Sequence, residues 1–98
     1  MQKYLQFDTV EGDQIIRLKD ILFFESCKNY YLIYHAGGQV YKCRGTLSDV
    51  EQRMKEFDFY RVHSAYLVNL DHIQAIKSNS KLTVTDGHEI SKYLEMFG

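Results

Sequence analysis

Short runs of β-branched and aromatic residues cover most of the chain, a pattern typical of strands. The first three runs are YLQF (4–7), QIIRL (14–18) and DILFFES (20–26), and polar or glycine-containing stretches separate them. Further runs follow at 29–36, 39–45, 60–63, 66–70, 73–78, 81–85 and 88–94. The pattern predicts a mostly β domain.

Two glycine-containing turns predict hairpins. Gly37-Gly38 separates NYYLIYHA from QVYKCRG, and adjacent glycines favour a type I′ turn because that turn needs a positive φ at both central residues. In the register of such a two-residue turn, Arg44 lies opposite Tyr31. Asp86-Gly87 predicts a second hairpin near the end of the chain.

Helical periodicity is confined to the stretch TLSDVEQRMKEF. Apolar side chains recur there at the spacing of one helix face, at Leu47, Val50, Met54 and Phe57. Either Thr46 or Ser48 can cap the helix, and Ser48 and Glu51 have the spacing of a capping box. We expect one short helix whose apolar stripe packs on a sheet, in preference to binding a partner helix.

Composition indicates one compact domain over residues 1–98. The 98 residues are 45% hydrophobic and include eight Tyr and six Phe, enough to form a core. A formal charge of -1 provides no overall positive field for nucleic acid or anionic membranes, so any such binding must be local. The sequence shows no bilayer-spanning run and no signal peptide at its polar start, so we expect a cytoplasmic protein without membrane contact.

The sequence offers little support for catalysis, a metal or a cofactor. Cys27 and Cys43 form no CxxC pair, and we expect both to be free, buried thiols. His63 and Ser64 are adjacent, but neighbouring side chains on an extended chain point to opposite faces, which is poor geometry for proton transfer. The four histidines show no metal-binding spacing. We therefore expect a protein that is not an enzyme and needs no cofactor.

Cations and aromatic residues alternate in two neighbouring stretches. CKNYY (27–31) combines a cation, an amide and two aromatic rings, and YKCRG (41–45) adds Lys42 and Arg44. Such groups suit contacts to phosphates and base edges. They suit a solvated sheet face equally well, so residue chemistry alone leaves both interpretations open.

The linear order of motifs resembles the LytTR family of bacterial DNA-binding domains. DILFFES, an aromatic hairpin, RGTLSDVEQRM, FYRVHSAYLVNLDHI and DGHEISK follow one another, and the resemblance extends from about Tyr4 to Tyr93. The most specific part is the pattern F-x-R-V-H-x-x-Y-L-V-N-x-x-x-I. It is matched by Phe59, Arg61, Val62, His63, Tyr66, Leu67, Val68, Asn69 and Ile73.

The resemblance implies an elongated, mostly antiparallel β fold of three small sheets with one short helix. It also implies sequence-specific binding of double-stranded DNA, with loops that enter successive major grooves at paired promoter repeats. Domains of this family usually follow a receiver domain in two-component response regulators, so the resemblance implies a receiver domain outside this chain. Two copies on tandem repeats would need only weak self-association on DNA.

Family positions supply a candidate contact set. The first contact loop corresponds to residues 28–31, the second to Ser64 and the third to Lys92. The family commonly has Arg where Ser64 stands and again where Lys92 stands, and both changes lose a guanidinium that could bind guanine bidentately. The full candidate set is Lys28, Asn29, Tyr30, Tyr31, Arg44, Arg61, His63, Ser64 and Lys92.

Three residues of the motif have competing interpretations. His63 either supports the loop or contacts DNA, and Arg61 either contacts a phosphate or forms a surface ion pair. Asn69 either reads a base or bonds to backbone at the turn before Asp71, and we expect the backbone role. A competing function is a protein-interaction domain that keeps the fold with a weakened DNA face.

Overall fold

The computed structural model of the protein describes residues 3–77 and 81–90. The strands are β1 (Tyr4–Thr9), β2 (Gly12–Arg17), β3 (Ile21–Cys27), β4 (Tyr30–His35), β5 (Val40–Arg44), β6 (Phe59–His63), β7 (Tyr66–Asn69), β8 (Ile73–Lys77), β9 (Lys81–Val84) and β10 (Glu89–Ile90). The helices are α1 (Leu47–Arg53) and two 3₁₀ turns, η1 (Leu18–Asp20) and η2 (Leu70–His72). The expected mostly β fold with one short α-helix is confirmed, and no helix in the described ranges could span a bilayer.

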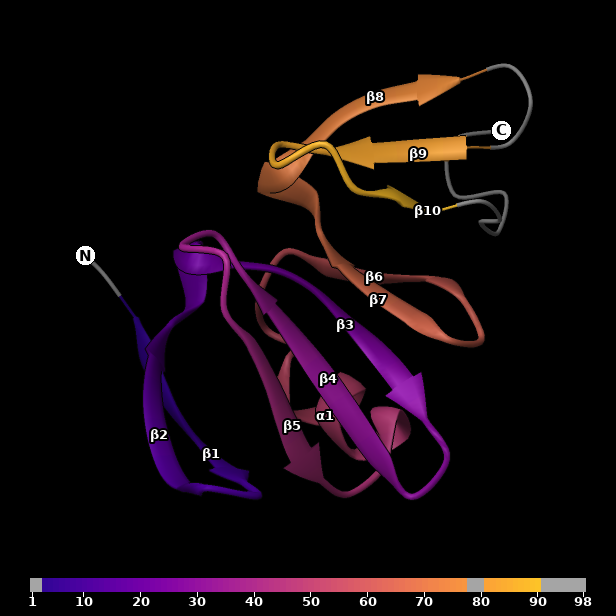
Figure 1. Cartoon of the computed structure of the whole chain (residues 1–98). Coiled ribbons are helices and arrows are strands. Elements are labelled where there is room, and N and C mark those ends of the chain that lie inside the picture. Colours follow the sequence, from indigo (N-terminus) through magenta and orange to yellow (C-terminus); the bar gives the residue numbers. More distant parts are fainter. Residues whose placement is uncertain (1–2, 78–80, 91–98) are drawn as a thin grey trace.

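The described strands form a seven-stranded sheet in the order β2-β1-β5-β4-β3-β7-β6 and a three-stranded sheet in the order β10-β9-β8. The strands pair antiparallel, as expected. The sheets number two where the family resemblance implied three, because one ladder pair, Thr9 with Cys43, joins the β1–β2 hairpin to β5. In Figure 1 this hairpin diverges from the strands beside it, and the small sheet lies beyond β6 and β7.

The first core lies between the large sheet and α1. Phe7, Phe24 and Ile33 of the sheet meet Val50 and Met54 of the helical segment, and all five are fully buried or nearly so. The predicted apolar stripe therefore packs on the sheet. Thr46 caps the helix by accepting a hydrogen bond from the Asp49 amide at 3.2 Å, which decides between the two expected caps.

The second core lies between the opposite face of the large sheet and the small sheet. Phe23 and Val68 pack there with Leu82, Val84 and Ile90. Since β3 contributes to both cores, its first four residues are all buried. Burial on both faces explains why DILFFES contains a continuous apolar run in place of strict alternation.

The β4–β5 hairpin differs from the expected register by one residue. Tyr30 lies opposite Arg44 and Tyr31 lies opposite Cys43. The turn has three residues, 36–38, in which Gly38 has a φ of 97° while Gly37 lies outside the left-handed region. The prediction of a two-residue type I′ turn was therefore wrong, since only one glycine takes a positive φ.

The predicted hairpin at Asp86-Gly87 is confirmed, because β9 and β10 pair antiparallel. Its turn is built like the β4–β5 turn: the Val84 amide bonds to the His88 carbonyl at 3.1 Å, and Gly87 has a φ of 91°. Both hairpins therefore place a single left-handed glycine at the last turn position.

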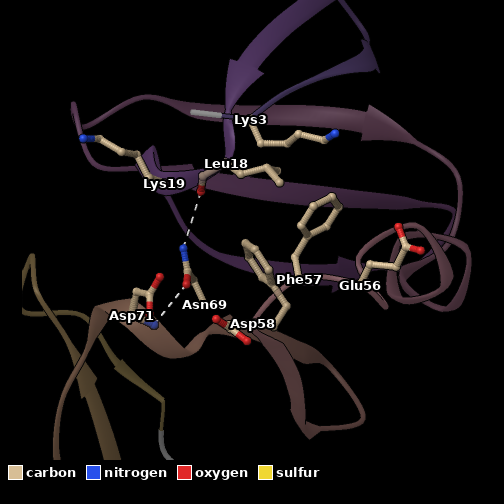
Figure 2. Close-up of a pocket in the computed structure, with 9 residues that line it drawn as sticks. Lys3, Leu18, Lys19, Glu56, Phe57, Asp58, Asn69 and Asp71 are labelled. Carbon is tan, nitrogen blue, oxygen red and sulfur yellow. Dashed lines mark hydrogen bonds between the residues drawn. The ribbon is translucent and has the colours of Figure 1, made fainter. Parts of the chain in front are cut away.

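Asn69 connects the end of β7 to the segment before β3. Its side-chain amide donates to the carbonyls of Ile21 at 2.9 Å and Leu18 at 3.4 Å, and its oxygen accepts from the Asp71 amide at 3.0 Å. Figure 2 shows the bonds to Leu18 and Asp71. The expected backbone role of Asn69 is confirmed, and its side chain is 3% exposed.

Replacing this side chain should destabilise the fold. Asn69→Ala leaves buried carbonyl oxygens without their donor, so the free energy of unfolding should fall by about 1–3 kcal/mol. Urea unfolding monitored by circular dichroism would measure the change. Asn29→Ala is the matched control, since Asn29 is exposed and its change should stay within about 0.5 kcal/mol. An unchanged unfolding midpoint for Asn69→Ala would contradict the assigned role.

Candidate nucleic-acid interface

Two turns that carry predicted contact residues meet at one end of the large sheet. The β3–β4 turn contains Lys28 and Asn29, and the β6–β7 turn contains Ser64 and Ala65. Because β3 pairs antiparallel with both β4 and β7, the end of β3 lies beside the start of β7, as Figure 1 shows. The Ser26 amide, near the end of β3, donates to the Ala65 carbonyl at 2.8 Å and holds the β6–β7 turn beside the start of the β3–β4 turn.

The β3–β4 turn presents polar side chains to solvent. Lys28 and Asn29 are both exposed, and Lys28 has a φ of 53°, the one positive value among the described non-glycine residues. This left-handed residue lets the chain reverse tightly between β3 and β4. The Gly45 amide donates to the Asn29 carbonyl at 3.4 Å, which holds the turn beside the end of β5.

The two tyrosines after this turn face opposite ways. Tyr30 is partly exposed, and the ammonium of Lys42 lies 4.3 Å from the centre of its ring. Tyr31 is 4% exposed, packs edge-on against Phe24, and burial raises the pKa of its hydroxyl, with the Cys43 thiol adding to the shift. Tyr31 is therefore a core residue and leaves the candidate contact surface, while Tyr30 stays on it.

Arg44 lies beside Tyr30 on the outer face. Its guanidinium pairs with the Asp8 carboxylate at 3.2 Å and donates to the Thr9 carbonyl at 3.0 Å. Both charged side chains are more than half exposed. Exposed ion pairs contribute little to stability, so this guanidinium can exchange Asp8 for another anion at small cost.

The motif residues of β6 hold the second turn. Arg61 pairs with Glu51 of α1 at 2.8 Å and donates to the carbonyls of His63 and Ser64, so in this structure it is an ion-pair partner. The Nδ1 atom of His63 accepts a hydrogen bond from the Ala65 amide at 3.1 Å. His63 therefore supports the turn, and Ser64 is exposed at the tip.

Sequence reasoning missed one polar cluster on the neighbouring strands. The Glu25 carboxylate accepts hydrogen bonds from the hydroxyls of Tyr34 at 2.8 Å and Tyr66 at 3.0 Å. Burial and then the Glu25 hydrogen bond raise the pKa of Tyr34 to about 12, and the same causes raise the pKa of Tyr66. The signal in the sequence was a carboxylate inside the apolar run DILFFES, whose partners lie on two other strands.

The third predicted contact, Lys92, lies outside the described residues. The structure thus brings together the first and second contact loops, with Arg44 close to the first. Within the described part of the chain, no three His, Cys, Asp or Glu side chains gather as metal ligands.

A cavity of about 270 Å³ opens at the other end of the large sheet (Figure 2). Its walls come from the chain start, η1, the segment before β6 and η2. They are formed by Lys3, Leu18, Lys19, Glu56, Phe57, Asp58, Phe59, Asn69 and Asp71. Since η1 precedes β3 and the contact turn follows it, the length of β3 separates the cavity from the candidate interface.

Comparison with known proteins supports the family resemblance. The sequence profile of the LytTr DNA-binding domain matches residues 13–92. The protein therefore belongs to the LytTr DNA-binding domain family. A search of curated protein sequences finds no significant match.

A solved structure from Bacillus cereus has the same fold. It is the LytTr DNA-binding domain of a protein described as a putative methyl-accepting/DNA response regulator. The two chains are 19% identical, superpose with a TM-score of 0.73, and overlap over 89% of this chain and 83% of the other. At this identity, the comparison concerns the fold.

The two thiols should differ strongly in reactivity. Cys27 is exposed at the end of β3, so the expectation of two buried thiols was wrong for Cys27 and right for Cys43. Burial raises the pKa of the Cys43 thiol to about 11, and the thiolate is the reactive form. With a disulfide reagent at pH 8, we expect one fast thiol in the folded protein and a second after urea unfolding. Cys27→Ser should abolish the fast phase, and two fast thiols in the folded protein would contradict the burial of Cys43.

Proposed function

We propose that the protein binds double-stranded DNA sequence-specifically, as the DNA-binding module of a bacterial transcriptional regulator. The observation that carries the proposal is that the β6–β7 turn is held beside the end of β3, from which the β3–β4 turn continues, by the hydrogen bond between Ser26 and Ala65. Membership in the LytTr family supports the same function. Turns held together at one sheet end form a narrow edge of the kind that can enter a major groove.

The exposed groups at this edge suit two kinds of DNA contact. Lys28 carries a positive charge for a phosphate, and Arg44 would bind a second phosphate by exchanging Asp8 for it. Such contacts would position the domain. Asn29 and Ser64 offer an amide and a hydroxyl for base edges. Lys92 remains the proposed third contact.

Local charge pairing answers the objection that the chain has a formal charge of -1. Two carboxylates near this end are each paired with a guanidinium, Glu51 with that of Arg61 and Asp8 with that of Arg44. Lys28 has no ion-pair partner among the residues that the structure describes. Interactions between charges are screened beyond about 8 Å at physiological salt, so the local charge governs contact with DNA.

The proposal extends to the assembly in which the domain works. As the family resemblance implies, the domain would bind paired promoter repeats, with two copies side by side on DNA and weak contact between them. A receiver domain outside these residues would supply the regulatory signal, and the protein would act in the cytoplasm. The DNA contacts require neither a cofactor nor catalysis.

A titration of the protein against randomised duplexes tests the proposal. Fluorescence anisotropy would measure binding, and sequencing of the bound fraction would reveal any preferred motif. Enrichment of a repeated motif is the expected result. Absence of binding even at low salt would overturn the proposal and favour the protein-interaction function.

Lys28→Gln should weaken DNA binding, because the variant has no ammonium to pair with a phosphate. Removing one such charge pair should reduce the magnitude of the slope of log affinity against log salt by about 0.9. Lys19→Gln is the matched control, because Lys19 is also exposed but precedes β3, at the far end of the sheet. Equal slopes for Lys28→Gln and the parent protein would remove Lys28 from the interface.

Ser64→Arg should tighten DNA binding by restoring the commoner family residue. A guanine contact would add about 1–3 kcal/mol of discrimination between duplexes. A phosphate contact would instead steepen the salt slope by about 0.9 and tighten all sequences alike. Because Ser64 is exposed, stability should stay within about 0.5 kcal/mol of the parent.

Gln74→Arg on β8 is the control for added charge. Gln74 is also exposed, but it follows η2, which lines the cavity at the end of the large sheet opposite the two turns. This variant should leave sequence discrimination unchanged. Unchanged affinity of Ser64→Arg with unchanged stability would show that the β6–β7 turn does not face DNA.

A further inference from the structure

We propose that Arg61 is a positioning residue of the DNA interface, which holds the β6–β7 turn so that the amide and hydroxyl of Ser64 point outward as DNA-contacting donors. This inference rests on the proposed function and specifies how its second turn binds. It also decides between the two roles that the sequence left open for Arg61, in favour of the ion pair.

All three guanidinium nitrogens of Arg61 are already engaged. Nη1 donates to the Glu51 carboxylate at 2.8 Å, and Nη2 donates to the Ser64 carbonyl at 2.5 Å. Nε lies 3.2 Å from the carbonyl oxygens of both His63 and Ser64. The side chain is 22% exposed. A phosphate would have to displace several of these acceptors at once, whereas the present contacts connect α1 to the turn.

These contacts fix the direction of the peptide groups at the tip. A trans peptide points its C=O and N–H to opposite sides, and the described residues include no cis peptide. Because the His63 carbonyl accepts from Arg61, the amide of Ser64 points away from Arg61. The Ser64 carbonyl is held in the same way, and the following amide, that of Ala65, donates to the His63 ring.

The result is a tip whose carbonyl acceptors are turned inward, while the amide and hydroxyl of Ser64 are the donors left to point outward. The carbonyls of His63 and Ser64 bind Arg61, and the carbonyl of Ala65 binds Ser26. The hydroxyl of Ser64 has no hydrogen-bond partner within residues 3–77 and 81–90. An outward amide and hydroxyl suit a phosphate oxygen or an acceptor on a base edge, both of which need donors.

The geometry requires a guanidinium at position 61. A planar guanidinium directs donors along several fixed directions, while an ammonium is a single compact charge. Arg61→Lys therefore keeps the charge but cannot hold Glu51 and two carbonyls together. If Arg61 were a phosphate contact, Lys would largely replace it.

The test compares Arg61→Lys with Arg53→Lys in the full chain. Arg53 is a matched control because it also donates to a backbone carbonyl, that of Gln6 at 2.7 Å, away from both turns. Binding to the enriched duplex is measured over a range of salt, with urea unfolding and amide hydrogen exchange of residues 63–66. Freeing about one backbone residue should weaken binding of Arg61→Lys about tenfold. The salt slope should be unchanged, and the turn amides should exchange faster.

Glu51→Gln provides a second variant should Arg61→Lys unfold. This variant removes the charge of the carboxylate that binds Arg61 and keeps an oxygen acceptor. Amide exchange in the turn should therefore be faster and DNA affinity lower than in the parent, but by less than in Arg61→Lys. Parent-like affinity for Arg61→Lys would overturn the positioning role. So would a loss of about 0.9 from the magnitude of the salt slope in Arg61→Met, which removes the positive charge, because that loss would mark a phosphate contact. Failure of the parent protein to bind any duplex would instead overturn the proposed function, and the inference with it.

Discussion

Burial of β3 on both faces is the constraint on which the rest of the structure depends. Residues 21–24 are all buried, with Phe24 facing α1 and Phe23 facing the small sheet. Removing both faces from water is the main driving force for assembling the two layers around this strand. Pairing of β3 with β4 and β7 then fixes what lies at each of its ends.

The candidate interface follows from the end of this strand. The β3–β4 turn continues directly from it, and the β6–β7 turn is brought beside it by β7 and by the bond from Ser26 to Ala65. Turns anchored on a buried strand lose little further conformational freedom on binding, which lowers the entropic cost of recognition. Arg61 extends this anchoring to α1 through Glu51.

The electrostatic character of each surface in this protein depends on which charged side chains contact one another, and not on the net charge of the chain. Glu25 lies between two tyrosine hydroxyls, while Asp8 and Glu51 each face a guanidinium. The partners in these pairs lie 9 to 41 positions apart in sequence, so a count of charges cannot show them. A nearly neutral chain can therefore still present a cationic edge.

The sequence by itself determined the strands, the single helix and the family, because alternation, helical spacing, turn residues and a motif are local properties. It also predicted the backbone role of Asn69. Only the tertiary structure decided that Tyr31 is buried and Tyr30 outward, because that depends on which face of β4 packs on the core. The one-residue difference in hairpin register decided that Cys43, and not Arg44, shares the buried face with Tyr31. The tertiary structure likewise decided the partner of Arg61, because Glu51 reaches it only when α1 packs on the sheet. Register and long-range pairing depend on which surfaces pack together, and that is a property of the whole fold.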